Sequence, residues 1–472
     1  MIRLYSQKNK KIGVFGLSRT GLAVCKSLAG IADLIVYDDS PDSRNSFYKH
    51  NISSKDYKMI NIDQPEWQVC DFIILSPGIP YYTTPHPIVK HAQKYNIPIK
   101  SDIDLLYNEY PNCKYIGITG TNGKSTTSTL IHHILTFTNG KFDLGGNIGK
   151  AVLSLRDNVE GYVLELSSFQ LDLITDLKLD VAVLLNITAD HIDRYHSFDQ
   201  YILSKQKILS LVTKNGCALI NKECSIISNT NYNTLYASKF RNTTCSLELI
   251  KKAINTDELN KSIADESINC QFQPTLVKFS SHLPQHINFT SLLLGKHNNQ
   301  NIAAAFYACK ILGRNEYDIT SAINQFQPLP HRMQYIGKKN NIHIYNDSKA
   351  TNADAASKAL LSLSNIYWIA GGVAKEGGVN SIVNTLYEVK KAYLYGQSRY
   401  ALAETLKGVV AFSINNTMEE AFNQAIIDAE SDQSGLDKNI LFAPACASFD
   451  QFKNFEDRGN QFIKISQKFI TE

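Results

Sequence analysis

The sequence of 472 residues has little of what marks membrane, secreted or nucleic-acid-binding proteins. No stretch reaches the ~18 apolar residues of a membrane helix, and the opening stretch MIRLYSQKNKKIGVFGLSRTG has no apolar run long enough for a signal peptide. The nine cysteines form no C-x-x-C pair, which favours reduced thiols in a cytoplasm. The net charge of +4 is small for this length, so the composition does not indicate a nucleic-acid-binding protein. We therefore expect a cytoplasmic protein with no membrane and no nucleic-acid partner.

The stretch YIGITGTNGKSTTSTLIHHIL, residues 115–135, contains a glycine-rich turn between a predicted strand and a predicted helix. Residues 115–118 are mostly apolar, and the apolar residues of 130–135 recur at helical spacing. Backbone N–H groups at such a helix start can bind an anion. Lys124 adds a positive charge for phosphates, and Ser125 or Thr126 offers a hydroxyl to a hydrated magnesium ion.

This turn is a shortened variant of the common phosphate loop. The common pattern has a glycine five residues before Gly123, but Ile118 occupies that position, which leaves G-T-N-G-K-S-T. The alternative is a glycine-rich turn in which Thr121 or Ser125 caps a helix. A lysine directly after a glycine has no use in capping, so we favour a phosphate site.

The N-terminal part has the pattern of a nucleotide-binding fold. KKIGVFGLSRTGLAVCKSLA predicts a strand, a glycine turn and a helix, and ADLIVYDDS predicts a second strand that ends at Asp38 and Asp39. DFIILSPGIP predicts another strand, followed by a turn at Ser76. The glycine spacing is not G-x-G-x-x-G, so NAD is poorly supported. In such a fold, a ribose or the edge of a uridine would lie beside Asp38 and Asp39.

Three further polar residues are predicted near the phosphate loop. GYVLELSSFQLD places Glu165 near the end of an apolar strand, where an unpaired acid is costly, so a ligand role is favoured. VAVLLNITADHIDRYHSFDQYILSKQKIL places His191 after a strand and Lys205 on the next helix. By default, His191 would be a satisfied turn histidine and Lys205 a solvated lysine.

Strand and helix patterns alternate along the chain, which indicates an α/β protein of three domains. IHIYNDSKATN, NIYWIAGG, KAYLYG and NILFAPACASFD predict a third set of strands, and the prolines of QPLPHRMQYI indicate a linker at about 326–332. We predict a Rossmann-like domain at 1–99, a central P-loop ATPase-like parallel sheet at 100–328, and a C-terminal Rossmann-like domain at 329–472.

The motifs together resemble the Mur ligase family over nearly the whole chain. GITGTNGKSTT, GGNIG, NITADHIDRY, GKHNNQNIAAA and PHRMQYI occur in the family's order. SSFQLD, NDSKATN and the stretch PACASFDQFKNFEDRGNQF resemble the members that add D-glutamate. A close alternative is another Mur-type or folylpolyglutamate-type amino-acid ligase. A nucleotide-binding switch or regulatory ATPase without ligation is the alternative from another class.

The resemblance implies an ATP-dependent ligation in the synthesis of peptidoglycan precursors. ATP would phosphorylate the carboxylate of UDP-N-acetylmuramoyl-L-alanine, and the amine of D-glutamate would attack the acyl phosphate. Positioning and charge neutralisation dominate phosphoryl transfer, so cations and Mg²⁺ are expected around the phosphates. These substrates are small molecules, and we expect a monomer.

The resemblance also implies roles for individual residues. Catalytic residues would be Lys124, Glu165, His191, Lys205, Arg332 and Lys349. ATP would be bound by Gly120, Thr121, Asn122, Gly123, Lys124, Ser125, Thr126, Asn298, Asn301, Arg332 and Asp347. The UDP substrate would be bound by Gly16, Leu17, Ser18, Asp38, Asp39, Ser40, Ser76, Asn147 and His191. D-glutamate would be bound by Lys375, Thr351, Ser448 and Phe455. Metal ligands would be Ser125, Glu165, His191 and Lys205, the last as a carbamate.

Each of these roles has a structural alternative. Asn298 and Asn301 could cap a helix, and Arg332 could be a surface arginine. Asp347 and Lys349 could pair with each other. Thr351 could be an ordinary turn residue, Ser448 could be a helix N-cap, and Phe455 could be a core residue.

Overall fold

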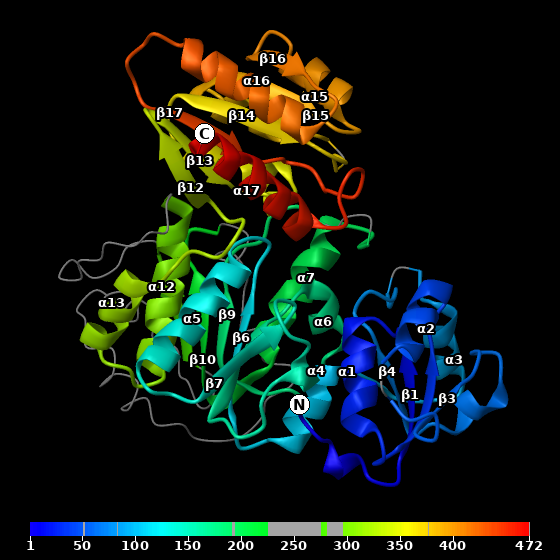
Figure 1. The fold of residues 1–472 in the computed structure, drawn as a ribbon. Coiled ribbons are helices and arrows are strands. Elements are labelled where there is room, and N and C mark those ends of the chain that lie inside the picture. The colour runs from blue at the N-terminus through cyan, green and yellow to red at the C-terminus, as the bar shows by residue number, and fades with distance from the viewer. Residues whose placement is uncertain are drawn as a thin grey trace. The chain divides into compact units, whose positions relative to one another are not determined.

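The computed structural model describes residues 1–50, 52–82, 84–190, 194–224, 275–280, 296–375 and 377–471. These residues form three sheets, each with helices packed on it (Figure 1). The chain divides into two compact units. The first two sheets belong to one unit, and the third sheet belongs to the other. The predicted α/β fold class is confirmed. The predicted boundaries after residues 99 and 328 stay predictions.

The first sheet is parallel, and its strand order changes direction between β1 and β4. Four of the five residues of β1 are buried, because this strand lies in the middle of the sheet. Ser18 is the N-cap of the helix that follows β1. The strand order is β3 (Tyr57–Met59), β2 (Asp33–Tyr37), β1 (Lys11–Phe15), β4 (Phe72–Leu75) and β5 (Ile99–Lys100). The helices are η1 (Tyr5–Gln7), α1 (Arg19–Leu28), α2 (Pro41–Tyr48), η2 (Pro65–Val69) and α3 (Pro87–Lys94).

The second sheet is also parallel, with β6 between β9 and β8. Its strands are apolar and buried because helices cover the sheet. The strand order is β11 (Thr275–Phe279), β10 (Val212–Asn221), β9 (Leu179–Leu184), β6 (Lys114–Thr119), β8 (Gly161–Glu165) and β7 (Phe142–Gly146). The helices are α4 (Asp102–Glu109), α5 (Lys124–Phe137), η3 (Val152–Ser154), α6 (Ser168–Leu173), α7 (Phe198–Ser210), α12 (Lys296–Ile311) and α13 (Glu316–Gln325).

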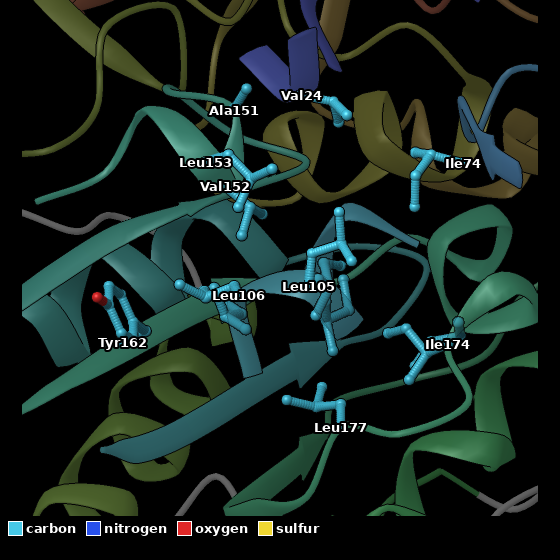
Figure 2. Packing of buried hydrophobic residues seen from close by; sticks show 14 of the residues in the cluster. Val24, Ile74, Leu105, Leu106, Ala151, Val152, Leu153, Tyr162, Ile174 and Leu177 are labelled. Atoms are coloured by element: carbon cyan, nitrogen blue, oxygen red, sulfur yellow. The ribbon is translucent and has the colours of Figure 1, made fainter. Parts of the chain in front are cut away.

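One hydrophobic cluster joins the first two sheets. Val24 of α1 and Ile74 of β4 belong to the same cluster as Leu105 of α4 and Leu153 of η3 (Figure 2). Such shared burial of apolar surface stabilises the contact between the two sheets' layers. The residues after the carboxyl ends of their strands are therefore held at defined positions within this unit.

The third sheet is parallel except for β12, which pairs antiparallel with β13. Leu360 of α14 and Leu402 of α15 pack in one buried cluster, whereas Phe422 of α16 and Phe462 of α17 pack in another. The strand order is β12 (Gln334–Lys339), β13 (Ile342–Asn346), β17 (Lys438–Phe442), β14 (Ile366–Gly371), β15 (Val389–Tyr395) and β16 (Ala411–Ile414). The helices are α14 (Ala353–Leu360), η4 (Asn380–Thr385), α15 (Arg399–Leu406), α16 (Met418–Ser431) and α17 (Phe455–Thr471).

None of the helices in the described residues is both long enough and apolar enough to cross a membrane.

Candidate active site

The turns after β1 and β4 contact each other where the strand order of the first sheet changes direction. The Ser76 hydroxyl donates to the Gly16 carbonyl at 2.9 Å. Gly16 has φ +92°, and a Cβ there would lie 2.6 Å from the Cβ of Ser76, so only glycine fits. In open parallel sheets, ligands bind in the crevice at this position.

Asp38 holds the same edge together through backbone amides. Its two carboxylate oxygens accept from the amides of Leu17 at 2.6 Å and Ser40 at 2.9 Å. Ser40 is also the N-cap of α2. Asp39 is exposed, and one of its oxygens lies 2.7 Å from the His86 ring. The structure therefore brings the predicted UDP residues of this sheet together, with Asp38 fixing the loop and Asp39 exposed beside it.

The phosphate loop follows β6 and leads into α5, as its sequence pattern predicts. Gly123 has φ +84°, and a Cβ there would lie 2.2 Å from Oδ1 of Asn301, so the loop needs glycine at this position. The ammonium of Lys124 donates to the carbonyls of Gly120 at 2.8 Å and Thr121 at 2.9 Å. Its positive charge thus lies at the loop, where a phosphate would need it.

Two residues from distant elements fix this loop. The side-chain amide of Asn186, which follows β9, both accepts from the Asn122 amide at 2.9 Å and donates to the Asn122 carbonyl at 3.0 Å. The Tyr201 hydroxyl on α7 lies 3.1 Å from the Thr121 hydroxyl. Neither Asn186 nor Tyr201 was predicted as a site residue, because an asparagine after a strand and a tyrosine on a helix are common.

Glu165 ends β8 beside the loop, with 2% of its surface exposed. The Asn147 side chain donates to Oε1 at 2.7 Å, and Oε2 is buried without a hydrogen-bond partner. A buried carboxylate oxygen with no donor is costly, and a bound cation would relieve that cost. The donor set therefore fits a hard divalent cation such as Mg²⁺. Ser125, the predicted hydroxyl ligand, is buried at the start of α5.

Lys205 is buried on α7, and its side chain extends to the phosphate loop. The ammonium donates to the Gly120 carbonyl at 2.9 Å and lies 4.8 Å from the centroid of the Tyr201 ring. Burial lowers the pKa of Lys205 well below its ordinary value, and the Lys124 charge lowers it further, against the opposing effect of Asp190 and Glu165. The default of a solvated lysine is wrong.

Part of the predicted metal site lies outside the described residues. His191, predicted as a catalytic, substrate and metal residue, belongs to that part. Among the residues that the structure does describe, no group of three or more His, Cys, Asp or Glu side chains could hold a metal ion. Glu165, Ser125 and a modified Lys205 remain the predicted ligands there.

Asn298 and Asn301 lie within α12 rather than at its N-cap. Both are buried, and the Thr127 hydroxyl of α5 donates to Oδ1 of Asn301 at 3.2 Å. Asn301 therefore packs against the phosphate loop and α5. Neither residue is itself the N-cap of α12, and their contact with ATP stays a prediction.

In the third sheet, residues after β13 contact the start of α17. Burial raises the pKa of Asp347 to about 6, although the Met333 amide, which donates at 3.1 Å, and the Arg332 charge lower it. The ammonium of Lys349 lies 3.7 Å from the centroid of the Phe455 ring. The predicted reaction-centre lysine and a predicted D-glutamate residue are thus in contact.

The other predicted D-glutamate residues follow neighbouring strands of the same sheet. Thr351 follows β13, Lys375 follows β14 and Ser448 follows β17, and these three strands are adjacent. Lys375 is exposed and Ser448 is buried. Ser448 is not a helix N-cap, since α17 begins at Phe455, and Phe455 is only half-buried.

Two arginines connect the substrate loops of the first two sheets and were missed by the sequence patterns. Arg19 of α1 donates to the carbonyls of Gly149 at 2.9 Å and Asn147 at 3.4 Å. Arg194 donates to the carbonyls of Gly78 at 2.7 Å, Pro77 at 3.2 Å and Ile79 at 2.5 Å. Each guanidinium thus binds the loop that belongs to the other sheet.

Comparisons with known proteins agree with this geometry. Residues 118–309 match the family described as Mur ligase middle domain, and residues 331–446 match the Mur ligase, glutamate ligase domain. A structure of UDP-N-acetylmuramate-alanine ligase MurC from Thermotoga maritima has a TM-score of 0.56 at 15% identity and covers 98% of this chain and 100% of its own. MurF ligase from Thermotoga maritima in complex with ADP has a TM-score of 0.57 at 13% identity, covering 99% and 100%. These likenesses show the fold.

Relatives that are closer in sequence have a more specific name. The UDP-N-acetylmuramoylalanine--D-glutamate ligase of Rickettsia prowazekii is 44% identical over 465 residues, which cover 98% of each chain. The protein of the same name in Agrobacterium fabrum is 37% identical and covers 98% of this chain and 96% of its own. The resemblance stated from the motifs is confirmed. The chain belongs to the Mur ligase family, and within it to the UDP-N-acetylmuramoylalanine--D-glutamate ligases.

Proposed function

We propose that this chain joins D-glutamate to UDP-N-acetylmuramoyl-L-alanine with ATP as the energy source. The γ-phosphoryl group passes to the alanine carboxylate, which releases ADP and forms an acyl phosphate. The amine of D-glutamate then attacks the acyl carbon, an amide bond forms, and inorganic phosphate leaves. Family membership supports this reaction, and one observation carries it: Lys124, Lys205 and the buried Glu165 all lie at the phosphate loop.

Magnesium is part of the proposal. The Oε2 atom of Glu165 and the hydroxyl of Ser125 are the described groups that would hold it. Bound there, the ion would neutralise charge on the phosphates during transfer. Asn147 keeps the Glu165 carboxylate oriented by donating to its other oxygen. Lys124 and Arg332 would neutralise the remaining phosphate charge.

Lys205 would be carbamylated. Burial lowers its pKa well below the ordinary value, which favours the neutral amine that carbamylation requires. Its nitrogen would bond to the carbon of carbon dioxide and release a proton to solvent. The product is an anion with two oxygens, the ligand type that Mg²⁺ prefers. The ammonium already lies at the Gly120 carbonyl of the phosphate loop, so the carbamate would reach the same place.

The two substrates would bind at the strand ends described above. The UDP end of the nucleotide would lie at the turns that contain Gly16, Asp39 and Ser76, and its sugar near Asn147. D-glutamate would lie at Thr351, Lys375, Ser448 and Phe455 in the domain proposed for residues 329–472. We further propose that the protein acts in the cytoplasm as a monomer.

The decisive experiment measures phosphate release with ATP, Mg²⁺ and UDP-N-acetylmuramoyl-L-alanine against a panel of D- and L-amino acids. The proposal expects release that requires both the nucleotide substrate and D-glutamate. Release with another amino acid would instead indicate a different ligase of the same family. Hydrolysis of ATP that needs neither substrate would overturn the proposal in favour of a nucleotide-dependent switch.

A further inference from the structure

A fully buried arginine, Arg458 of α17, joins three loops of the third sheet. Its Nε and one terminal nitrogen donate to the hydroxyl of Ser348 at 3.1 Å and to the carbonyl of Ser348 at 2.8 Å. Its other terminal nitrogen donates to the carbonyls of Cys446 at 3.0 Å and Gly371 at 3.4 Å. These partners, in the described residues, are a hydroxyl and three backbone carbonyls, and none is a carboxylate.

The three loops follow three adjacent strands. Ser348 follows β13, Cys446 follows β17, and Gly371 is the last residue of β14. The planar guanidinium has donors at fixed angles, so the oxygens that bind it are held at fixed relative positions. A buried charge is retained only when such bonds compensate it. Arg458 therefore determines how the ends of these strands are spaced.

The backbone beside Arg458 leaves room for its side chain only because residue 372 is a glycine. Gly372 has φ +126°, and a Cβ there would lie 2.2 Å from the Ala447 carbonyl and 3.2 Å from a terminal nitrogen of Arg458. The Ser348 hydroxyl, which accepts from Arg458, donates to the carbonyl of Phe455 at 2.9 Å. The same network thus reaches the first residue of α17.

Each loop held by Arg458 carries a residue that the proposed function assigns to D-glutamate or to the reaction centre. Lys349 comes directly after Ser348, Lys375 lies four positions after Gly371, and Ser448 lies two positions after Cys446. Phe455 lies one helical turn before Arg458 on the same helix. We propose that Arg458 is the positioning residue that sets the geometry of the D-glutamate site. This inference rests on the proposed function.

The test is Arg458→Lys, which keeps the charge but loses the planar fork. Loss of one or two charge-assisted hydrogen bonds should raise KM for D-glutamate by about 10- to 100-fold. KM for UDP-N-acetylmuramoyl-L-alanine should stay within about 2-fold of wild type, because none of the residues assigned to it lies in these three loops. KM for ATP should rise less than KM for D-glutamate, because Asp347 is the one residue assigned to ATP that lies in them. Hydrogen exchange should become faster in all three loops, at 347–351, 371–375 and 445–448.

The matched control is Tyr393→Phe. It removes a 2.7 Å hydrogen bond to Asp428 from a buried residue of the same domain, away from the three loops. The control should lower stability without changing KM for D-glutamate. If Arg458→Lys does not fold, Ser348→Ala replaces it, because this variant removes only the hydroxyl bonds to Arg458 and Phe455. The same selective rise of KM is expected.

A wild-type KM for D-glutamate in folded Arg458→Lys would overturn the inference, as would an equal rise in all three KM values. Unchanged exchange in the loops would overturn it as well. A wild-type enzyme that does not use D-glutamate would refute the proposed function instead. The exchange experiment needs no substrate, so it still decides whether Arg458 positions the loops.

Discussion

Asn147 donates its side-chain amide to Oε1 of Glu165 at 2.7 Å, while Oε2 of the same buried carboxylate has no partner. One oxygen is thus used to orient the group, and the other is left for a ligand. This asymmetry separates the two functions of Glu165 and makes them testable with separate variants.

Glu165→Gln should fold and should lose at least about 100-fold in kcat, because a neutral amide binds Mg²⁺ weakly compared with a carboxylate. The concentration of Mg²⁺ that gives half-maximal rate should rise as well. Asn147→Ala should have a smaller effect of the same kind, since it removes only the orienting bond. Rates measured over a range of Mg²⁺ concentrations, with thermal unfolding as the folding control, check this. A wild-type Mg²⁺ dependence in Glu165→Gln would contradict it.

Lys205→Ala should be nearly inactive, and a small carboxylic acid such as acetate should restore part of the rate. The acid would supply the two oxygens that the carbamate supplies in the wild type. Lys207→Ala is the matched control, because Lys207 lies on the same helix and donates to the Asp172 carbonyl at 3.0 Å instead of to the phosphate loop. It should stay active and should not respond to acetate. Full activity of Lys205→Ala would disprove the carbamate.

Arg194→Ala should raise KM for UDP-N-acetylmuramoyl-L-alanine by about 10-fold, because the loop at 77–79 loses three hydrogen bonds from a charged donor. KM for ATP should change little. Arg19→Ala should act in the same direction through the loop at 147–149. Arg156→Ala is the control, since that guanidinium donates to the Phe142 carbonyl within the second sheet. Equal KM values in Arg194→Ala and wild type would refute the role.

Asp347 should make the protein less stable as pH rises from about 4 to 6. Its pKa in the folded state is raised from 3.8 to about 6, so between these values the folded state holds a proton that the unfolded state has lost. The contribution to the free energy of unfolding is fully present below the unfolded pKa and falls by about 3 kcal/mol as pH passes the folded one.

Asp347→Asn should remove that part of the pH dependence. Burial also raises the pKa of Asp102 to about 7, with the same sign, so the wild-type profile contains both effects. The difference between wild type and Asp347→Asn in urea unfolding, measured from pH 4 to 8, isolates Asp347. A difference that does not change with pH would show that the folded and unfolded pKa values of Asp347 are equal.

The sequence by itself determined the features that depend on neighbouring residues. Glycines between an apolar strand and a helix specify the turn at 120–124, and β6 and α5 lie on either side of it, as predicted. The apolar run before Glu165 places this acid at a strand end. These features are local, because hydrophobic periodicity and turn chemistry are read over a few residues.

Only the tertiary structure decided which distant side chains meet. Asn122 and Asn186 pair across 64 positions, and Arg458 binds Ser348 across 110. Arginine, asparagine and lysine occur in many environments, so the residue type in the sequence does not predict which side chain or backbone group it will contact. Lys205 is the clearest case, since its helix predicts a solvated side chain while packing buries it at the phosphate loop. Burial and nonlocal hydrogen bonds arise only when helices and loops from distant parts of the chain pack onto the sheets. They then determine the pKa values and the orientations of the side chains on which the chemistry depends.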